Sequence, residues 1–337
     1  MILVTGATGL LGAHLLYHLL QTEDKVKALY RGKSKLQTVK NVFSYYCDKP
    51  QQLFDKVEWV EAEILDVPSL EEAFVGVTKV YHVAAVIAFD TESEKLMNKV
   101  NIEGTANVVN MCLNNSIEKL CHVSSVATLG KTLNGAEITE DNQWNPDADN
   151  SGYAISKNGA EMEVWRGVEE GLNSVIVNPS IILGPGFWNS GTGNFFPMVK
   201  KGMKFYTEGM SGFVGVNDVA KIMIALMNSK VKHQRFIVSS GNLRYKDIFT
   251  SIADNLQVSP PKFKAMKWML SIAWRADLLK SIVFGTEHKL SKYSARSSVN
   301  TNRFNNGKIK EELSFSFQKM EDVIKEVSTI FRKEHQS

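Results

Sequence analysis

The sequence predicts an α/β fold in which a doubly wound parallel sheet precedes a smaller C-terminal region. Residues 1–4 form an apolar run of strand length, and residues 10–20 are apolar at helical spacing. Strand-like and helix-like segments then alternate as far as Asn178, which is typical of a parallel sheet with helices on both faces. After Gly184 the pattern loosens into loops and short helices. We therefore expect one domain at residues 1–180 and a second region at 181–337, with residues 213–230 packing back on the sheet.

Three glycines, Gly6, Gly9 and Gly12, recur at every third position between the first strand and the first helix. The first backbone N–H groups of a helix lack intrahelical partners, and together with the helix dipole they bind anions. Glycines there let a pyrophosphate approach the backbone, as in Rossmann-type dinucleotide sites. A glycine turn that only closes an α/β unit is the alternative. The cofactor contacts expected here are Gly6, Thr8, Gly9, Leu10, Leu11 and Gly12.

The spacing Y-x-x-x-K occurs twice, at Tyr45/Lys49 and at Tyr153/Lys157. Tyr45 lies in a polar stretch with no serine-bearing strand before it, which favours a solvated helix end. Tyr153 opens a helix, and residues four apart on a helix share one face. The phenol and the ammonium of the second pair can therefore point into one pocket. Upstream, residues 119–125 read as a buried strand that ends in two serines, at the strand end where doubly wound sheets bind ligands.

These residue types suit proton transfer to a carbonyl oxygen or from an alcohol. A free tyrosine has a pKa of about 10, so a phenol that titrates near pH 7 needs roughly 4 kcal/mol of preferential stabilisation of its anion. A lysine cation and an oxidised nicotinamide can supply it, because opposite charges lower the pKa of an acid. A serine hydroxyl can hydrogen-bond the substrate oxygen where charge develops.

Together these motifs resemble those of the extended short-chain dehydrogenase/reductase family, which includes NAD-dependent epimerases and dehydratases. The G-x-x-G-x-x-G spacing after Thr5 is typical of that family. In it the catalytic serine lies five residues before a glycine, which here selects Ser125 through Gly130. The resemblance implies catalytic roles for Ser125, Tyr153 and Lys157. It also implies that Tyr153 and Lys157 contact the cofactor, the lysine through the nicotinamide ribose. It also matches Asn101 to an asparagine used in proton relay; a buried polar residue at a helix kink is the alternative.

Further segments match the family in order along the chain. The resemblance implies that Glu63 and Ile64 bracket the adenine, although the family usually has aspartate where Glu63 stands. It places Ala84 and Ala85 under the cofactor, and it places Pro179 and Ile181 beside the nicotinamide. Residues 213–220 match a signature of the substrate half. His82 falls inside the strand before Ala84, and a packed core histidine is the favoured interpretation.

The end of the second strand bears on the choice of cofactor. An acidic residue there holds the ribose 2′-OH of NAD, and an arginine accommodates the 2′-phosphate of NADP. The strand at residues 25–30 is followed by Arg31, with Lys35 nearby. The sequence thus favours NADP, with NAD possible. An arginine in a solvated loop is the alternative interpretation of Arg31.

Composition sets broader limits. The net charge of +3 is too small to indicate a nucleic-acid partner. Cys47, Cys112 and Cys121 have no metal-binding spacing, so we expect no metal centre, and their odd number suggests a reducing, cytoplasmic environment. The apolar N-terminus lacks a basic region, which argues against a signal peptide. Charges interrupt residues 266–284, so we expect no membrane span there but an amphipathic helix over the substrate cleft; contact with a membrane surface is the lesser alternative.

Three classes of function fit these features. The first is an NADP-dependent reductase of an uncharged aldehyde or ketone, similar to dihydroflavonol reductases. The second is a nucleotide-sugar epimerase or dehydratase, and the third is a non-catalytic NADP sensor. Nucleotide-sugar members commonly carry an arginine two residues before Phe213, where this chain has Ser211. Aromatic residues crowd the expected cover of the substrate, although this crowding is equally consistent with lid packing. The expected substrate contacts are Phe89, Ser125, Phe187 and Trp188.

The resemblance also bears on assembly. In many family members two long helices, here at about residues 92–115 and 151–171, pair with those of a second copy. A homodimer is therefore implied by resemblance.

Overall fold

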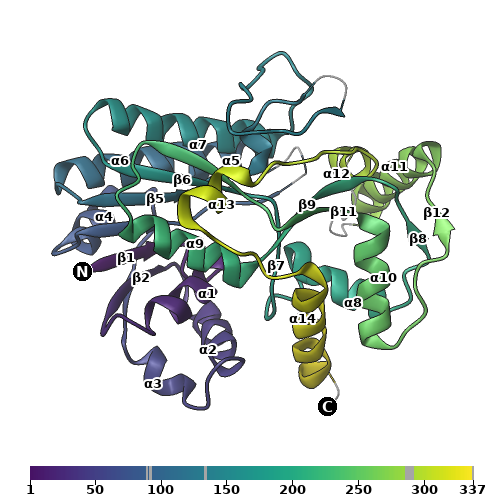
Figure 1. Ribbon diagram of the computed structural model, residues 1–337, viewed down its shortest axis with the longest axis horizontal. Helices are drawn as coiled ribbons and strands as arrows, with labels where there is room; N and C mark the ends of the chain where they lie inside the picture. Colours follow the sequence, from purple (N-terminus) through teal and green to yellow (C-terminus); the bar gives the residue numbers. More distant parts are fainter. Residues whose placement is uncertain (89, 91–92, 133–134, 285–291, 336–337) are drawn as a thin grey trace.

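The computed structural model describes residues 1–88, 90, 93–132, 135–284 and 292–335, with no side-chain description for 278–284. Seven strands form one sheet in the order β10-β6-β5-β4-β1-β2-β3, and every neighbouring pair is parallel. This confirms the predicted doubly wound α/β fold (Figure 1). The strands are β1 (Ile2–Thr5), β2 (Val26–Tyr30), β3 (Val57–Glu61), β4 (Lys79–His82), β5 (Lys119–Val123), β6 (Ser174–Pro179) and β10 (Gln234–Val238).

Helices cover both faces of this sheet because alternate residues of each strand point to opposite sides. Val4 of β1 packs in a cluster with α1 (Leu10–Leu19), α2 (Leu36–Ser44) and α9 (Val216–Asn228). Leu3, its neighbour, packs in the cluster on the other face with α4 (Val67–Phe74), α6 (Gly104–Asn114) and α7 (Gly152–Glu169). The two apolar layers hold the strands side by side, and the predicted site residues lie at the carboxyl ends of these strands.

The helix expected at about 92–115 is not uniform. It comprises α5 (Glu94–Met97), a π-helical segment (Asn98–Glu103) and α6. A π-helical turn inserts an extra residue into the helical hydrogen-bond pattern and is frequent at functional sites. Asn101 lies within this turn, where no periodicity of apolar residues would have indicated it.

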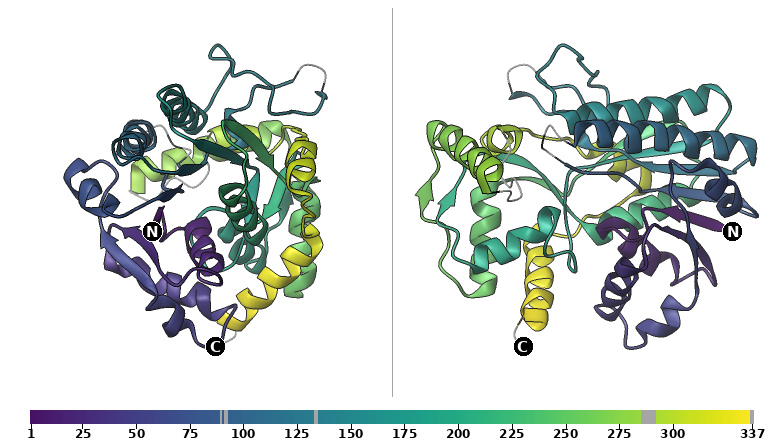
Figure 2. Two further views of the ribbon diagram at one scale, coloured as in Figure 1. Left: turned by 60° about the vertical axis from the view of Figure 1, so that its left-hand side comes forward. Right: turned by 180° about the vertical axis from the view of Figure 1, so that it is seen from behind.

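The C-terminal region is built on a small sheet of order β11-β9-β7, in which β7 (Ile181–Leu183) and β9 (Met210–Gly215) are parallel and β11 (Gly241–Arg244) is antiparallel to β9. A third cluster of apolar side chains joins this sheet to α8 (Phe195–Lys200), α10 (Tyr245–Leu256) and α14 (Met320–His335). In Figure 2, α14 runs along the outside of this region to the C-terminus. The remaining helices and strands are α3 (Pro50–Phe54), β8 (Phe205–Tyr206), β12 (Phe263–Lys264), α11 (Lys267–Phe284), α12 (Lys292–Ser297) and α13 (Gly307–Leu313).

The chain crosses between the two parts more than once. After β7–β9 it returns to the large sheet as α9 and β10, and α9 packs closely against α1. It then leaves again through β11 and α10. Segments from both halves of the sequence therefore pack on the large sheet.

Candidate functional site

The glycine turn after β1 leaves a helix end open to a ligand. Gly6 has a φ of +67°, and a Cβ built on it would lie 2.5 Å from the backbone N of Ala84. A Cβ on Gly12 would lie 2.2 Å from the carbonyl oxygen of Gly6. Only glycine fits these two positions. Gly9 caps α1 without any side-chain hydrogen bond, and the first turn of α1 has no acidic residue. The backbone N–H groups of Leu10 and Leu11 thus remain available to an anion.

Beside this turn, the ends of β1 and β4 are linked by hydrogen bonds that involve a buried histidine. The backbone N–H of Ala84 donates to Thr5 Oγ1 at 3.2 Å. His82 is fully buried and its ring nitrogens lie 2.7 Å from Thr5 Oγ1 and 2.9 Å from Thr105 Oγ1. Burial, with the Lys157 charge adding to it, lowers the pKa of His82 to about 3. The ring is therefore neutral, and the interpretation of His82 as a core residue is confirmed.

Ser125, which follows the end of β5, lies beside Tyr153 at the start of α7. Ser125 begins a short 3₁₀ turn, where its Oγ accepts from the backbone N–H of Ala127 at 3.1 Å. The helix of Tyr153 is capped by Ser151, whose Oγ accepts from the N–H of Ala154 at 3.0 Å. Burial raises the pKa of Tyr153, while a hydrogen bond to Ser125 acts in the opposite direction. The side chains of Ser125 and Tyr153 are thus hydrogen-bonded to each other.

Lys157 lies one turn beyond Tyr153 and is buried, with a relative exposure of 2%. Its Nζ donates to the carbonyl oxygen of Val123, the last residue of β5, at 2.7 Å. Burial lowers the pKa of Lys157 to about 8, and the charge of Glu161 partly offsets that effect. Unlike this pair, Tyr45 caps the end of α2 and its hydroxyl donates to Glu334 at 2.5 Å. The first Y-x-x-x-K spacing, Tyr45/Lys49, therefore lies at a helix end as expected, but Tyr45 is half-buried against the core cluster around α1 and α2 and not fully solvated.

Asn101 clamps the segment after β4 to α7. Its Oδ1 accepts from the backbone N–H of Val86 at 2.7 Å, and its Nδ2 donates to the Val86 carbonyl and to Ser156 Oγ, both at 3.0 Å. Ser156 in turn donates to the carbonyl of Tyr153 at 2.9 Å. The Asn101 side chain is 1% exposed, and all these bonds hold the backbone near Tyr153 in place. They suit a buried polar residue in a π-helical turn, while a part for Asn101 in proton relay stays a prediction.

Sequence patterns gave no sign of the buried carboxylate of Glu161. Five side-chain donors bind it: Ser124 Oγ at 2.5 Å, Thr128 Oγ1, Asn178 Nδ2 and Arg235 Nη1 at 2.9 Å each, and Trp165 Nε1 at 3.4 Å. Burial alone would raise the pKa of Glu161, but these donors hold it below its ordinary value. The ionised group joins α7 to the loop that carries Ser125. Only its position four residues after Lys157, on the same helical face, could have indicated it.

Arg31 and Glu63 face each other beyond the ends of β2 and β3. The guanidinium lies 3.5 Å from the carboxylate, and both side chains are about half exposed. Lys35 is exposed in the following 3₁₀ turn. Ile64 contacts Gly104, where a Cβ would lie 2.5 Å from its Cδ1, and its carbonyl accepts from Asn107. This edge therefore carries two exposed cations, Arg31 and Lys35, and the carboxylates of Glu61 and Glu63, beside the apolar Ile64.

The remaining predicted residues are distributed as follows. Pro179 is buried at the end of β6, Ile181 is half-buried at the start of β7, and Ala85 is exposed after β4. Phe187 packs against the cluster around α1 and α2. Trp188 is 8% exposed, its ring packs against Phe196 and Phe331, and its indole donates to Glu334. Phe89 lies outside the described residues. Trp188 therefore belongs to the apolar core of the C-terminal region.

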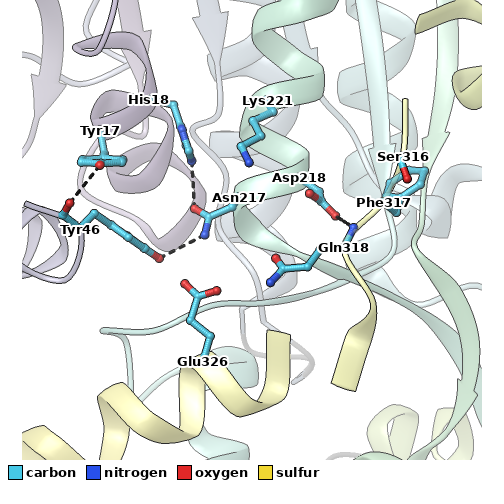
Figure 3. Close-up of a pocket in the computed structure, with 10 residues that line it drawn as sticks. All are labelled: Tyr17, His18, Tyr46, Asn217, Asp218, Lys221, Ser316, Phe317, Gln318 and Glu326. Carbon is cyan, nitrogen blue, oxygen red and sulfur yellow. Dashed lines mark hydrogen bonds between the residues drawn. The ribbon is translucent and has the colours of Figure 1, made fainter. Parts of the chain in front are cut away.

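A separate polar pocket of about 490 Å³ lies between α1, α9 and the segment before α14 (Figure 3). His18 Nε2 is 3.0 Å from Asn217 Oδ1, and Asp218 accepts from the backbone N–H of Gln318 at 2.8 Å. None of its lining residues is among the predicted site residues. The first bond joins α1 to α9, and the second attaches the segment before α14 to α9.

Among the described residues there is no cluster of side chains suited to a metal ion, and the three cysteines are free. The described helices include none that is long and apolar enough to cross a membrane.

Comparison with known proteins identifies the family of this chain. The model of the NAD-dependent epimerase/dehydratase family matches residues 2–239. The chain belongs to this family. It is 27% identical over 280 residues to a dihydroflavonol 4-reductase-like protein of Synechocystis sp., covering 80% of this chain and 77% of the relative. It is 29% identical over 290 residues to anthocyanidin reductase of Arabidopsis thaliana, covering 78% and 81%. The crystal structure of gox2253 superposes with a TM-score of 0.81 at 25% identity, covering 100% and 99%.

This family membership fits the site geometry. The protein is an NAD(P)-dependent enzyme of the extended short-chain dehydrogenase/reductase type. The matched range includes every predicted cofactor residue from Gly6 to Ile181, and the start of α1 has no side-chain cap. Segments α10 to α14 lie beyond the matched range.

Proposed function

We propose that this epimerase/dehydratase-family enzyme reduces an uncharged, largely apolar aldehyde or ketone, with Tyr153 as the proton donor. The observation that carries the proposal is the meeting of Ser125 and Tyr153 above the buried Lys157. A tyrosine in this position can protonate a carbonyl oxygen that Ser125 hydrogen-bonds. The nicotinamide dinucleotide, when bound, supplies the hydride.

Each side chain has a separate task in this mechanism. Lys157, fixed on the Val123 carbonyl, keeps a positive charge near the phenol and favours the phenolate that forms after proton transfer. Ser125 orients the carbonyl oxygen of the substrate. Glu161 and its donors hold the Ser125 loop against α7, so the two hydroxyls stay within hydrogen-bond reach. The glycine turn and the start of α1 bind the pyrophosphate.

The assay that tests this proposal follows the oxidation of NADPH by absorbance with a panel of apolar aldehydes and ketones. Turnover with at least one uncharged carbonyl compound, absent in Tyr153→Phe, is the expected result. A panel that shows no turnover above that of Tyr153→Phe would contradict the proposal.

The alternative is a nucleotide-sugar epimerase or dehydratase that uses the same three residues. A diphosphate in a partly dry cleft needs a bidentate cation such as arginine. Ser211 stands at the position where nucleotide-sugar members carry that arginine, and here it hydrogen-bonds the half-buried Tyr245. This favours the uncharged substrate. Titration calorimetry with UDP- and dTDP-sugars should show no binding at micromolar concentrations; a clear signal would favour the epimerase. A non-catalytic NADP sensor is disfavoured because the chain retains Tyr153 and Lys157.

We further propose that NADP is the preferred cofactor. Arg31 and Lys35 offer exposed positive charges at the end of β2, where a 2′-phosphate would lie. The carboxylate of Glu63 lies across from Arg31 rather than at the end of β2, so it does not replace the acidic residue expected of an NAD site.

We also propose that the enzyme forms a homodimer and works in a reducing compartment. Exposed apolar side chains on the outer helices, Leu96 of α5 with Ile155 and Met162 of α7, are between 47% and 57% exposed and suit a homodimer contact. The three free cysteines suit a reducing compartment such as the cytoplasm.

A further inference from the structure

The end of the C-terminal region carries exposed aromatic rings on a two-stranded sheet. Strands β8 and β12 are parallel, and Phe205 is opposite Phe263 in register. Their ring centroids are 5.9 Å apart, and the side chains are 45% and 60% exposed. Neighbouring Tyr206 lies under the ammonium of Lys246 from α10, so this strand presents its other side to the protein. The two phenylalanines therefore face outward.

The exposed apolar surface continues onto the next helix. Met266 directly precedes α11 and is 50% exposed. Within α11, Trp268 and Ile272 are 65% and 60% exposed and lie four residues apart on one face. Figure 1 shows β8, β12 and α11 together at the end of the molecule opposite the N-terminus, and Figure 2 shows the same end from behind. We call Phe205, Phe263, Met266, Trp268 and Ile272 the tip surface.

Positive charges surround the tip surface. Residues 198–207 and 255–276 contain seven lysines or arginines and no aspartate or glutamate, although the whole chain is nearly balanced with 39 basic and 36 acidic residues. The lysines that flank the aromatic residues are exposed, and within the described part of the chain they form no ion pairs; they are Lys201, Lys204, Lys262, Lys264 and Lys267. These segments therefore carry net positive charge, with Glu208, Asp254 and Asp277 next beyond their ends.

This charge pattern distinguishes between two possible partners of the tip surface, a second copy of the chain and an anionic lipid bilayer. A two-fold contact between copies would place the lysines of one tip surface against those of the other, and like charges at an interface oppose association. An anionic bilayer complements both features, since it attracts lysines electrostatically and accepts tryptophan and phenylalanine rings at its interface. The tip surface also lies beyond residue 239, where the family match ends, except for Phe205.

We propose that the tip surface docks the enzyme on the surface of an anionic lipid bilayer. The rings of Phe205, Phe263 and Trp268 enter the headgroup region, and the surrounding lysines approach the lipid phosphates. The contact is peripheral and requires no spanning segment. It is independent of the catalytic assignment, because no predicted site residue is part of it.

The experiment is cosedimentation of the full-length protein with vesicles of phosphatidylcholine mixed with phosphatidylglycerol, compared with phosphatidylcholine alone. Binding to the mixed vesicles only, reversed by high salt, is expected because exposed charges are screened. The emission of Trp268 should shift to shorter wavelength on the mixed vesicles, and this shift should be absent in Trp268→Phe.

Matched charge variants test the location of the contact. A lysine near an anionic surface contributes about a fivefold factor in binding. Lys262→Glu/Lys267→Glu should therefore bind the mixed vesicles at least about 25-fold more weakly than the wild type. Lys230→Glu/Lys232→Glu changes the net charge equally at exposed positions between α9 and β10, and it should bind nearly as the wild type does.

Three results would overturn the proposal. The first is equal binding to neutral and mixed vesicles, and the second is equal weakening by the two charge variants. The third is a concentration-dependent increase in mass by light scattering, abolished by Trp268→Glu, in a protein that binds no vesicles. That result would assign the tip surface to a second copy of the chain.

Discussion

The hydroxyl of Ser124 donates a 2.5 Å hydrogen bond to the carboxylate of Glu161, joining the end of β5 to the middle of α7. Ser125, the next residue, takes part in the proposed chemistry, and Lys157 lies one helical turn before Glu161 on the same face. One buried anion therefore holds the serine loop and influences the lysine charge. Both functions can be tested by removing the charge while keeping the shape.

Glu161→Gln should lower the free energy of unfolding by about 3 kcal/mol, because Arg235 loses its buried partner. Urea denaturation measures the change. Glu163→Gln on the same helix is the matched control; its pairing with Arg166 is partly exposed, so its effect should stay within about 0.5 kcal/mol. Equal losses in the two variants would show that Glu161 has no special structural role.

The ionisation of Glu161 also predicts how stability depends on pH. Its folded-state pKa lies below the ordinary value, so its contribution is complete above the unfolded-state pKa and is lost as pH falls through the folded-state pKa. The difference in unfolding free energy between wild type and Glu161→Gln should therefore shrink on acidification below pH 4.5, the ordinary value for the group. A difference that stays constant down to acid unfolding would contradict this assignment.

Lys157 predicts the alkaline side of the activity profile. Burial lowers its pKa to about 8, so the lysine cation, and with it the rate, should decline as pH rises through this value. Glu161 raises that pKa, so Glu161→Gln should move the decline to lower pH. The measurement is kcat against pH for both proteins. A wild-type profile that is flat up to about pH 10, the ordinary range of a lysine, would refute the role of the charged lysine.

Much of this site could be predicted from the sequence because its parts are local. The glycine turn occupies seven residues, and Tyr153 and Lys157 share one helical turn. The Glu161 network could not be predicted in this way. Besides Trp165 of α7 itself, its donors come from the residue after β5, from β6, from β10 and from a 3₁₀ turn, and Arg235 lies 74 residues away along the chain. Only the order of strands in the sheet brings these groups together.

The burial of the aromatic residues could not be predicted either, because it also depends on the tertiary fold. Trp188 lies near the expected substrate cover in the sequence, yet the tertiary fold packs it against Phe331 of α14. The exposure of Trp268, by contrast, depends on how α11 is placed on the C-terminal region. Composition alone does not distinguish a buried aromatic ring from an exposed one.

Tyr153→Phe should abolish turnover while NADPH binding survives, because only the proton donor is removed. Lys157→Ala should reduce both, since the family lysine also contacts the nicotinamide ribose. Stopped-flow turnover and fluorescence titration of NADPH separate the two effects. A Tyr153→Phe enzyme with a rate near that of the wild type would refute the mechanism, whatever the cofactor affinity.

Met162→Glu tests the proposed homodimer. Met162 is 57% exposed on the outer face of α7, and a carboxylate there would be buried without a partner in a dimer. Light scattering should show a dimer for the wild type and a monomer for the variant. Val75→Glu, a change at a 70% exposed position elsewhere, is the control and should remain dimeric.

Arg31→Ala should weaken NADPH binding about 10- to 100-fold and leave NADH binding nearly unchanged, because a charge-assisted hydrogen bond contributes about 1.5–3 kcal/mol. Lys25→Ala removes an exposed cation just before β2, at the end of the strand away from Arg31, and it should affect neither cofactor. Glu63 lies 3.5 Å from the Arg31 guanidinium and competes with a 2′-phosphate for it, so Glu63→Gln should strengthen NADPH binding. Fluorescence titration of both cofactors against the four proteins gives these affinities. If NADPH and NADH bind equally and Arg31→Ala changes neither, the end of β2 does not select the cofactor.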